Sequence, residues 1–241
     1  MKNLNFPGLP LLIFLTTAVS TSSAQKKAPK NEYGLTVVSK ISECKCTQKS
    51  AGDLRMVPLD HYVSHLITDF RYATSDNFTG KPLYKNPAAY GRLLLAKNLA
   101  NAQNDLKIMN LGIKIWDAYR PYSVTKKLWL KVLDEKYAAN PAYGSGHNRG
   151  VAVDVTLVDL ETGRELPMPT GFDNFTIKAH QDYDDLPAEV RKNRALLKAV
   201  MEKNGFVALE TEWWHYSLPD ATKRFEVLDI PFEVLGRRIG R

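Results

Sequence analysis

The sequence predicts an α+β protein, a single domain with a central antiparallel sheet flanked by helices. Helical and strand patterns are mixed along the chain without the strict strand–helix alternation that builds a parallel sheet. Two short strand patterns near the C-terminus follow each other closely, as in a hairpin. With 241 residues, 44% of them hydrophobic and 24% charged, the chain has enough apolar side chains to form a core.

The first 24 residues differ in composition from the rest of the chain. Lys2 precedes an apolar run over residues 9–19, and the small residues "SSA" then lead up to Gln25. This order is typical of a secretory signal peptide, and the run is shorter than the ~20 residues of a membrane span. No cysteine follows the run closely, which disfavours a lipoprotein anchor. We therefore expect residues 1–24 to be removed on export, with a periplasmic or secreted product and no stable membrane anchor.

Residues 25–55 are polar and lack a strong period, which indicates an arm or linker ahead of a domain over residues 56–241. Both cysteines of the chain, Cys44 and Cys46, lie in this arm. Neighbours this close rarely satisfy disulfide geometry. We expect them to be exposed and unpaired, with no disulfide framework supporting the fold.

The first half of the predicted domain contains two helical patterns. Residues 57–74 show an apolar period that begins after Pro58, with Asp60 as a possible cap. Residues 77–84 contain Gly-Lys-Pro, which indicates a loop or hairpin. The second helix is expected to start with Asn86 as its N-cap and Pro87 in the first turn.

The second half alternates strands with helices. Residues 112–121 read as a strand that runs into a turn at a proline, and residues 121–140 read as a helix. The alternating valines of residues 150–160 predict a clear strand. A helix over residues 184–205 is bounded by a proline near its start and a glycine at its end. Residues 206–218 read as a pair of short strands.

The formal net charge is +7, but the basic residues are spread along the chain. They reach no more than pairs, as in "QKK", "TKK" and "GRR". A nucleic-acid-binding protein usually concentrates basic and aromatic side chains on one face. The pattern excludes that class and leaves a mild attraction to anionic polymers such as cell-wall material.

The stretch "YGSGHNRGVAVDVTL" places His147 seven residues before Asp154. Asp154 shares its strand face with small side chains, so another group has room to approach it. Gly146 and Gly150 flank His147 and allow the sharp turn that would aim the imidazole at the same place.

A second stretch, "ETEWWHYSL", places Glu212 three residues before His215. Two histidines and an aspartate suit Zn²⁺, which in catalytic sites has three protein ligands and an open position for water. We predict that His147, Asp154 and His215 bind one zinc ion and that Glu212 is the base beside it. Taken singly, each residue is better explained as an ordinary surface or core residue, and only the combination favours zinc. In a regular strand, residues three apart face opposite sides, so Glu212 would have to lie in the turn before the strand.

The remaining histidines are weaker candidates. His61 and His65 are four apart, as two zinc ligands on a helix would be, but the glutamate of an HExxH motif is missing. We expect them on an ordinary helix surface. His180 has no recognisable partner in the sequence.

These motifs resemble those of the zinc D-alanyl-D-alanine dipeptidases of the VanX type. "SGHNRGVAVD" fits the pattern SxHxxGxAxD, and "EWWH" fits ExxH. Further segments of similar character are "RYATSDNFTGKPLY", "WDAYRP", "MPTGFDNF" and "NRALLKAVMEKNGF", and the resemblance covers roughly residues 55–220. It implies a hedgehog/D,D-peptidase-like fold, because related D,D-carboxypeptidases and hedgehog-type domains share the zinc pattern.

The resemblance also implies roles for further residues. His147, Asp154 and His215 match the zinc ligands, Glu212 the catalytic base, and Arg120 the arginine that stabilises the tetrahedral intermediate. Residues that match substrate-binding positions are Ser145, Asp173 and Tyr72. The implied substrate is a small D,D-dipeptide, hydrolysed in cell-wall peptide turnover.

Two other functions remain open from the sequence. The chain could be a D,D-carboxypeptidase or wall endopeptidase that acts on longer peptides, or a zinc-binding domain without catalysis. The presence of both Glu212 and Arg120 favours an enzyme, because a pure binding domain needs neither. The segment from Arg120 to His147 is shorter than in the best-known members, and the C-terminal "RFEVLDIPFEVLGRRIGR" does not align, so the rim of the pocket is expected to differ.

Overall fold

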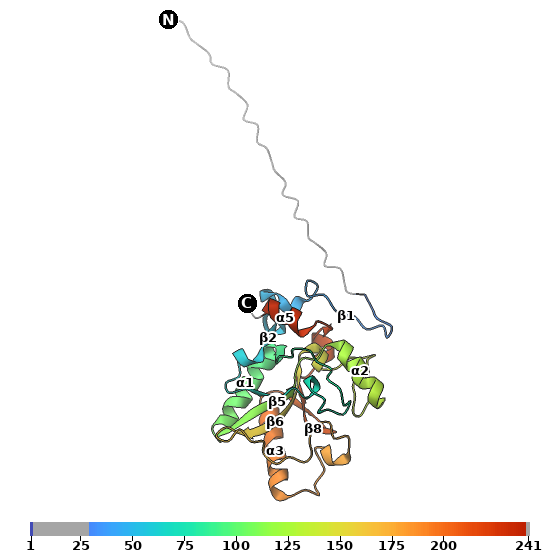
Figure 1. The fold of residues 1–241 in the computed structure, drawn as a ribbon. Helices are drawn as coiled ribbons and strands as arrows, with labels where there is room; N and C mark the ends of the chain where they lie inside the picture. The colour runs from blue at the N-terminus through green and yellow to red at the C-terminus, as the bar shows by residue number, and fades with distance from the viewer. Residues whose placement is uncertain (2–28, 240–241) are drawn as a thin grey trace.

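A computed structural model describes Met1 and residues 29–239 of the chain (Figure 1). Its centre is a five-stranded sheet in which each pair of neighbours is antiparallel except β3 and β5. The strands, in spatial order, are β3 (Ile67–Thr68), β5 (Leu111–Asp117), β6 (Ala152–Asp159), β8 (Glu212–Ser217) and β7 (Val207–Leu209). The predicted α+β class with a mainly antiparallel sheet is confirmed.

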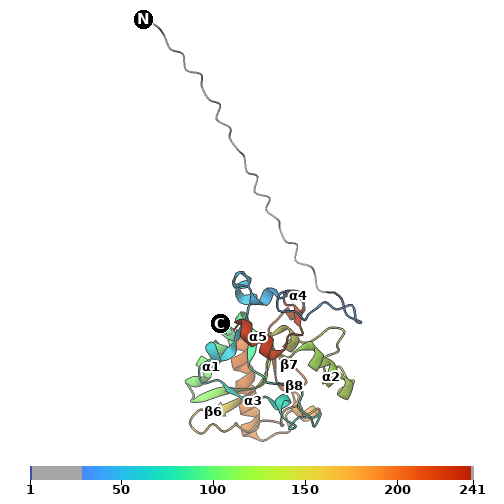
Figure 2. The same cartoon turned by 45° about the horizontal axis from the view of Figure 1, so that its top comes forward.

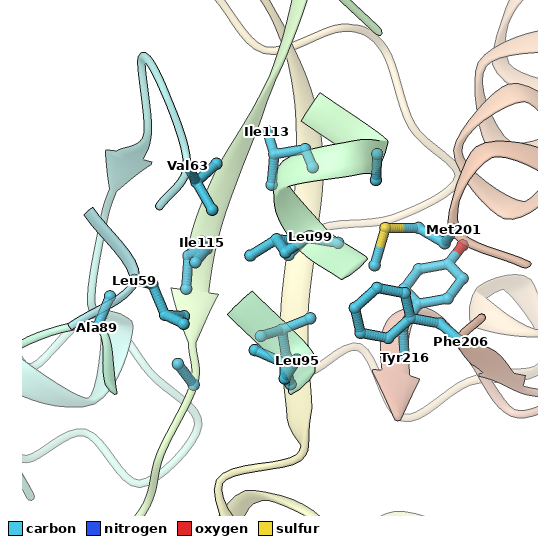
Figure 3. Close-up of a cluster of buried hydrophobic side chains, with 14 of the residues drawn as sticks. Leu59, Val63, Ala89, Leu95, Leu99, Ile113, Ile115, Met201, Phe206 and Tyr216 are labelled. Atoms are coloured by element: carbon cyan, nitrogen blue, oxygen red, sulfur yellow. The ribbon is translucent and has the colours of Figure 1, made fainter. Parts of the chain in front are cut away.

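Helices α1 (Leu93–Lys107) and α3 (Ala188–Lys203) contact each other and the central sheet. Their apolar side chains form the main core together with alternate residues of β5 and β6 (Figure 3). Leu95, Leu99, Ile113 and Ile115 are fully buried there, because helical spacing and strand alternation both place them on the shared face. The other face of β6 carries Asp154.

Helix α3 begins after Pro187 and is followed by Gly205 at a φ of 83°, as the sequence predicts. Strands β7 and β8 form the predicted hairpin. Helix α2 (Tyr122–Val132) is shorter than predicted, because Leu133 adopts a left-handed conformation with a φ of 52° and ends it.

The helix predicted after Pro58 is wrong. Strand β2 (Met56–Pro58) pairs antiparallel with β4 (Tyr90–Arg92), and the chain then passes through short 3-10 turns. The same pairing corrects the start of α1: Asn86 and Pro87 precede β4, and Arg92 is the N-cap. Pairing between distant segments therefore overrides the local helical pattern.

Short 3-10 helices occupy several connections in the described part of the chain: η1 (Lys45–Thr47), η2 (Lys49–Leu54), η3 (Leu59–His61), η4 (Arg71–Ala73), η5 (His147–Arg149) and η6 (Ile177–Ala179).

The N-terminal and C-terminal segments lie side by side (Figures 1 and 2). Strand β1 (Val37–Val38) pairs in parallel with β9 (Val227–Leu228), which follows α4 (Ala221–Arg224) and precedes α5 (Phe232–Ile239). The segment predicted as an arm or linker is therefore packed against the domain.

The prediction for the cysteines is also wrong. Cys44 and Cys46 form a disulfide with a Cα–Cα distance of 5.1 Å, and both side chains are buried in a second apolar cluster with Val38, Leu228 and Ile230. Residue Lys45 lies in a 3-10 turn, which brings the two cysteines together across one intervening residue.

The predicted signal peptide lies outside the described residues. In the part of the chain that the structure describes, no helix has both the length and the apolar character needed to cross a membrane.

Candidate metal centre

His147, Asp154 and His215 meet at one end of the central sheet. Their candidate ligand atoms all lie within 4.8 Å of one another. Asp154 Oδ2 is 3.3 Å from His147 Nε2, and Asp154 Oδ1 is 2.9 Å from His215 Nδ1. The two ring nitrogens are 3.2 Å apart. The three residues predicted from two separate motifs thus form one cluster.

Strand pairing explains how two of these side chains meet. Asp154 on β6 lies directly opposite His215 on β8, so both side chains point to the same face of the sheet. His147 comes from the turn before β6. That turn closes at Gly150, whose φ of 69° favours glycine, and a Cβ there would lie 2.6 Å from Met56 Sδ.

A backbone carbonyl fixes the orientation of the His147 ring. Its Nδ1 lies 2.7 Å from the carbonyl oxygen of Ala118, so Nδ1–H donates there and the Nε2 lone pair faces the cluster. This tautomer is the one that a metal ligand needs. Burial lowers the pKa of His215, which favours its neutral, ligating form.

The donor set fits zinc. Two imidazole nitrogens and one carboxylate are common protein ligands of catalytic Zn²⁺, with one position left for water or substrate. Burial opposes ionisation of Asp154, but the neighbouring His147 and His215 outweigh it and hold the pKa of Asp154 well below its usual range. The expected cofactor, Zn²⁺, therefore has an ionised carboxylate and two nitrogen donors in this cluster.

Glu212 is the first residue of β8, and its Oε2 lies 3.9 Å from His215 Nδ1. In a regular strand it would face away from His215. The β7–β8 register shifts between Ala208 and Leu209, and Glu212 pairs with Leu209 at the end of the hairpin. Burial, followed by the charges of Asp154 and Asp173, raises the pKa of Glu212 well above its ordinary value.

Arg120 is held beside the cluster by a buried aspartate that the sequence analysis missed. Arg120 Nε and Nη2 donate to Asp117 Oδ2 over 2.8 and 2.7 Å, and Nη2 is 3.7 Å from Asp154 Oδ2. Tyr84 Oη donates to the other oxygen of Asp117 over 2.7 Å. The signal that could have indicated this pair is the Asp-x-x-Arg spacing in "WDAYRP".

A cavity of about 230 Å³ opens onto the cluster. All eight predicted site residues line it: Tyr72, Arg120, Ser145, His147, Asp154, Asp173, Glu212 and His215.

Asp173 is a further acidic residue of this cavity. It accepts a hydrogen bond from Tyr72 Oη at 3.2 Å on Oδ1, and its Oδ2 is buried without a partner among the described residues. Burial and the charge of Asp154 raise the pKa of Asp173 to about 8. Its backbone has a φ of 58°, in the left-handed region that aspartate adopts more readily than most residues other than glycine. An unsatisfied buried carboxylate in a cavity is suited to a cationic ligand group.

Ser145 is placed by a reciprocal turn with Asn148. The Asn148 amide N–H donates to Ser145 Oγ over 3.2 Å, and the Ser145 amide N–H donates to Asn148 Oδ1 over 2.9 Å. Asn148 Nδ2 donates in addition to the carbonyl of Arg120. Asn148 therefore links the turn that carries His147 to the residue that carries the guanidinium.

Phe78 and Tyr137 line the cavity and were not predicted from the sequence, and Phe175, which is not a lining residue, packs against both. The ring of Phe175 lies 5.2 Å from that of Tyr137 and 5.1 Å from that of Phe78, measured between centroids. Thr211 Oγ1 donates to the carbonyl of Lys136 over 3.2 Å, on the same segment as Tyr137. We call Phe78, Tyr137 and Phe175 the aromatic arch. It joins three connecting segments beside the cavity, and no local motif marks it.

The other histidines lie away from this centre. His61 belongs to η3 and His65 follows it with a φ of 55°, so neither lies on the helix that was predicted. His180 Nε2 is buried without a hydrogen-bond partner among the described residues.

Comparison with known proteins gives one consistent result. The family model of the M15 peptidases, described as D-Ala-D-Ala dipeptidase, matches residues 52–233. A D-alanyl-D-alanine dipeptidase of Escherichia coli K12 is 38% identical over 157 residues, which cover 64% of this chain and 79% of that protein.

Two further relatives carry the same description. The Enterococcus faecium protein is 33% identical and covers 72% of this chain and 96% of its own length. The Streptomyces coelicolor protein is 32% identical and covers 75% of this chain and 98% of its own length. The matched range contains every residue of the cluster and of the cavity described above.

Proposed function

The chain belongs to the M15 family of D-Ala-D-Ala dipeptidases, and from that premise we propose that it hydrolyses D-alanyl-D-alanine and similar D,D-dipeptides to free D-amino acids. The observation that carries this proposal is the arrangement of a His-Asp-His cluster, Glu212 and Arg120 around one small cavity. A metallopeptidase needs a metal, a proton acceptor and an oxyanion-stabilising group within reach of one peptide bond.

His147, Asp154 and His215 hold the zinc ion in this proposal. When bound, zinc supplies a Lewis acid that polarises a carbonyl and lowers the pKa of water. The contact between Asp154 and both imidazoles, together with the Ala118 carbonyl behind His147, fixes the ligands before the metal arrives.

Glu212 is the general base. Its carboxylate lies beside the cluster, in position to take a proton from the attacking water and to return it to the leaving amine. Closeness to His215 keeps the carboxylate within reach of the scissile bond, since His215 contributes to the metal site.

Arg120 stabilises the charge that develops on the carbonyl oxygen. The salt bridge to Asp117 fixes the guanidinium, and Tyr84 in turn fixes Asp117. Asp117 is a positioning residue, because it acts through Arg120. A donor that is oriented in advance lowers the barrier, because it needs no reorganisation during the reaction.

The two ends of the substrate have complementary partners in the cavity. Asp173, with a buried and unpartnered oxygen, suits the ammonium group of the dipeptide, and Tyr72 holds that carboxylate in place. Ser145 offers a hydroxyl for the terminal carboxylate. An ammonium group beside Asp173 would also offset the cost of its ionisation.

The size of the cavity favours a dipeptide over a longer peptide. At about 230 Å³ it is smaller than a typical drug-sized ligand site, which is roughly 300–1,000 Å³. Phe78 and Tyr137 of the aromatic arch line the cavity, and we propose that the arch blocks the path of a longer chain. The competing activity is that of a D,D-carboxypeptidase on longer peptides, which requires this arch to open.

The proposed setting is cell-wall peptide turnover outside the cytoplasm. The support for export is the leader-like composition of residues 1–24, and fractionation of cells that produce the full chain tests it.

The test of function is D-alanine release from the free dipeptide and from a wall pentapeptide, each with and without a zinc chelator. Chelator-sensitive release from the dipeptide alone is expected. Release from the pentapeptide would identify a carboxypeptidase, and no release from either with zinc bound would identify a binding domain.

The Glu212→Gln variant tests the assignment of the base. It should retain zinc while kcat falls by about 10²–10⁴, the usual contribution of a general base. Full turnover in that variant would remove Glu212 from the mechanism.

A further inference from the structure

A second, larger cavity lies away from the catalytic one, between the two terminal segments of the described chain. Its volume is about 790 Å³, and no residue lines both cavities. Strand β2, the 3-10 segments around it and helix α5 form its walls. Figures 1 and 2 show these N-terminal and C-terminal elements side by side. We call this cavity the terminal groove.

The walls of the terminal groove are held firmly. Gly236 of α5 lies against Tyr90, where an added Cβ would come within 2.5 Å of the Tyr90 hydroxyl. The ring of Phe232 stacks on that of Tyr90 at 6.4 Å, and Tyr90 belongs to β4, which pairs with β2. Helix α5 therefore packs closely on the β2–β4 pair. We infer that these contacts hold the walls of the groove in place without a ligand.

Three arginines line the terminal groove: Arg55, Arg237 and Arg238. Within the described residues, none of the three forms an ion pair, and no aspartate or glutamate lines the groove. Among the described residues, the buried Nε atom of Arg55 has no hydrogen-bond acceptor. A buried donor without a partner is costly, so the three guanidinium groups favour an oxyanion that the described residues do not supply.

The terminal groove also has an apolar part, which we call its floor. The floor consists of Ile41, Val57, Tyr62, Val234 and Ile239, and the polar residues Thr47, Gln48 and His61 line the groove as well. A small inorganic anion would leave these side chains uncovered. A ligand that joins an oxyanion to an apolar portion would satisfy both the guanidinium groups and the floor.

We propose that the terminal groove binds the head group of an anionic phospholipid. The phosphate accepts hydrogen bonds from Arg55 and from the two arginines of α5, and the first carbons of the lipid lie on the apolar floor. Guanidinium forks match phosphate oxygens in geometry and charge, and basic pockets bind lipid head groups by the same chemistry.

Segments on both sides of the family match help to form the terminal groove. The family match ends at residue 233, and Val234, Arg237, Arg238 and Ile239 follow it. On the N-terminal side, Ile41 precedes residue 52, where the match begins. We therefore expect the lipid to influence where the enzyme is located and to leave the catalytic reaction unchanged.

The test is calorimetric titration of the full chain with dihexanoyl-phosphatidylglycerol below its micelle concentration. The comparison ligands are dihexanoyl-phosphatidylcholine and glycerol 3-phosphate. We expect saturable one-to-one binding of the anionic lipid, at least tenfold tighter than either comparison ligand, and weaker at high salt. Equal binding of the zwitterionic lipid, or of glycerol 3-phosphate, would overturn the proposal and leave only apolar or simple anion binding.

The matched variants locate the site. The triple variant R55Q/R237Q/R238Q should bind the anionic lipid at least tenfold more weakly, with unchanged dipeptide hydrolysis as the check of its folding. The control R164Q/R191Q/K131Q removes the same charge from exposed positions elsewhere and should bind like the wild type. If the triple variant does not fold, R237Q/R238Q alters only exposed side chains of α5 and should still show a measurable loss. Unchanged affinity in the folded variant would contradict the proposal.

Discussion

Asp154 and His215 occupy directly opposed positions on neighbouring antiparallel strands, with Asp154 Oδ1 2.9 Å from His215 Nδ1. The register of β6 and β8 therefore sets the distance between two of the three proposed metal ligands. A slip of one residue would send one of them to the opposite face of the sheet, so sheet pairing and metal binding depend on each other.

His215→Ala should abolish zinc binding. The variant leaves one imidazole and one carboxylate, which is fewer than the three protein ligands of a catalytic zinc site. Zinc content after dialysis, measured by atomic absorption, should fall from about one per chain in the wild type to near zero. The His180→Ala variant, altered outside the cluster, should keep its zinc, and a full zinc content in His215→Ala would exclude that residue as a ligand.

Asp117→Asn should lower kcat by about 10–100-fold and change KM little. The side chain keeps its volume but loses the charge that fixes Arg120, so oxyanion stabilisation is weakened more than substrate binding. Steady-state kinetics with zinc-loaded protein measures both constants. As a control, Tyr84→Phe removes one hydrogen bond to Asp117 and should lower kcat less. A rise in KM alone in Asp117→Asn would contradict the positioning role.

Asp173→Asn should stabilise the metal-free protein at alkaline pH and weaken dipeptide binding. The pKa of Asp173 is raised to about 8 in the folded protein, so the folded state binds the proton more tightly than the unfolded state, whose value is near 3.8. Wild-type stability therefore falls as pH rises from about 4 to 8. The Tm of the variant should exceed that of the wild type most above pH 8, and the two Tm values should be equal near pH 4.

The matching measurement for Asp173→Asn is thermal unfolding across that range with chelator present, followed by KM at neutral pH. An equal Tm difference at every pH would show that the carboxylate does not titrate as described. An unchanged KM would remove Asp173 from the ammonium site.

Phe175→Ala should relax the length limit on the substrate. The Phe175 ring lies between those of Phe78 and Tyr137, so its loss opens the aromatic arch. The ratio of kcat/KM for a tripeptide ending in D-alanyl-D-alanine to that for the dipeptide should rise at least tenfold. Phe175→Leu keeps an apolar side chain of similar reach and should stay near the wild-type ratio. A wild-type ratio in Phe175→Ala would show that another part of the cavity limits the length of the substrate.

The sequence is sufficient to predict that His147, Asp154 and His215 lie together, but not to predict the side from which Glu212 approaches them. His147 and Asp154 lie in one short motif around a glycine turn, and the alternation of β6 indicates which face Asp154 occupies. The position of Glu212 depends on a register shift in the β7–β8 pair, which spacing alone does not encode.

Other errors come from distant strand pairing or from the local path of a loop. The apolar period after Pro58 resembles a helix, but Met56–Pro58 pairs with Tyr90–Arg92, a contact across more than thirty residues. The Cys44–Cys46 bridge and the aromatic arch also depend on the local path of connecting segments. The motifs around His147 and His215 were predicted to meet although they lie far apart, because their residue types share one chemistry. The helix after Pro58 and the cysteine pair were predicted wrongly, because neither strand pairing nor the path of a loop is marked by local residue spacing.

The parallel pair of β1 and β9 has a consequence for the order of folding. Val37 pairs with Val227, so a segment near the start of the chain finds its partner only when nearly all of the chain is present. Loop-closure entropy makes such a contact late and slow. The central sheet and the His-Asp-His cluster lie between these strands in sequence. We therefore expect the central sheet to form first and the β1–β9 pair to join the two ends of the domain afterwards.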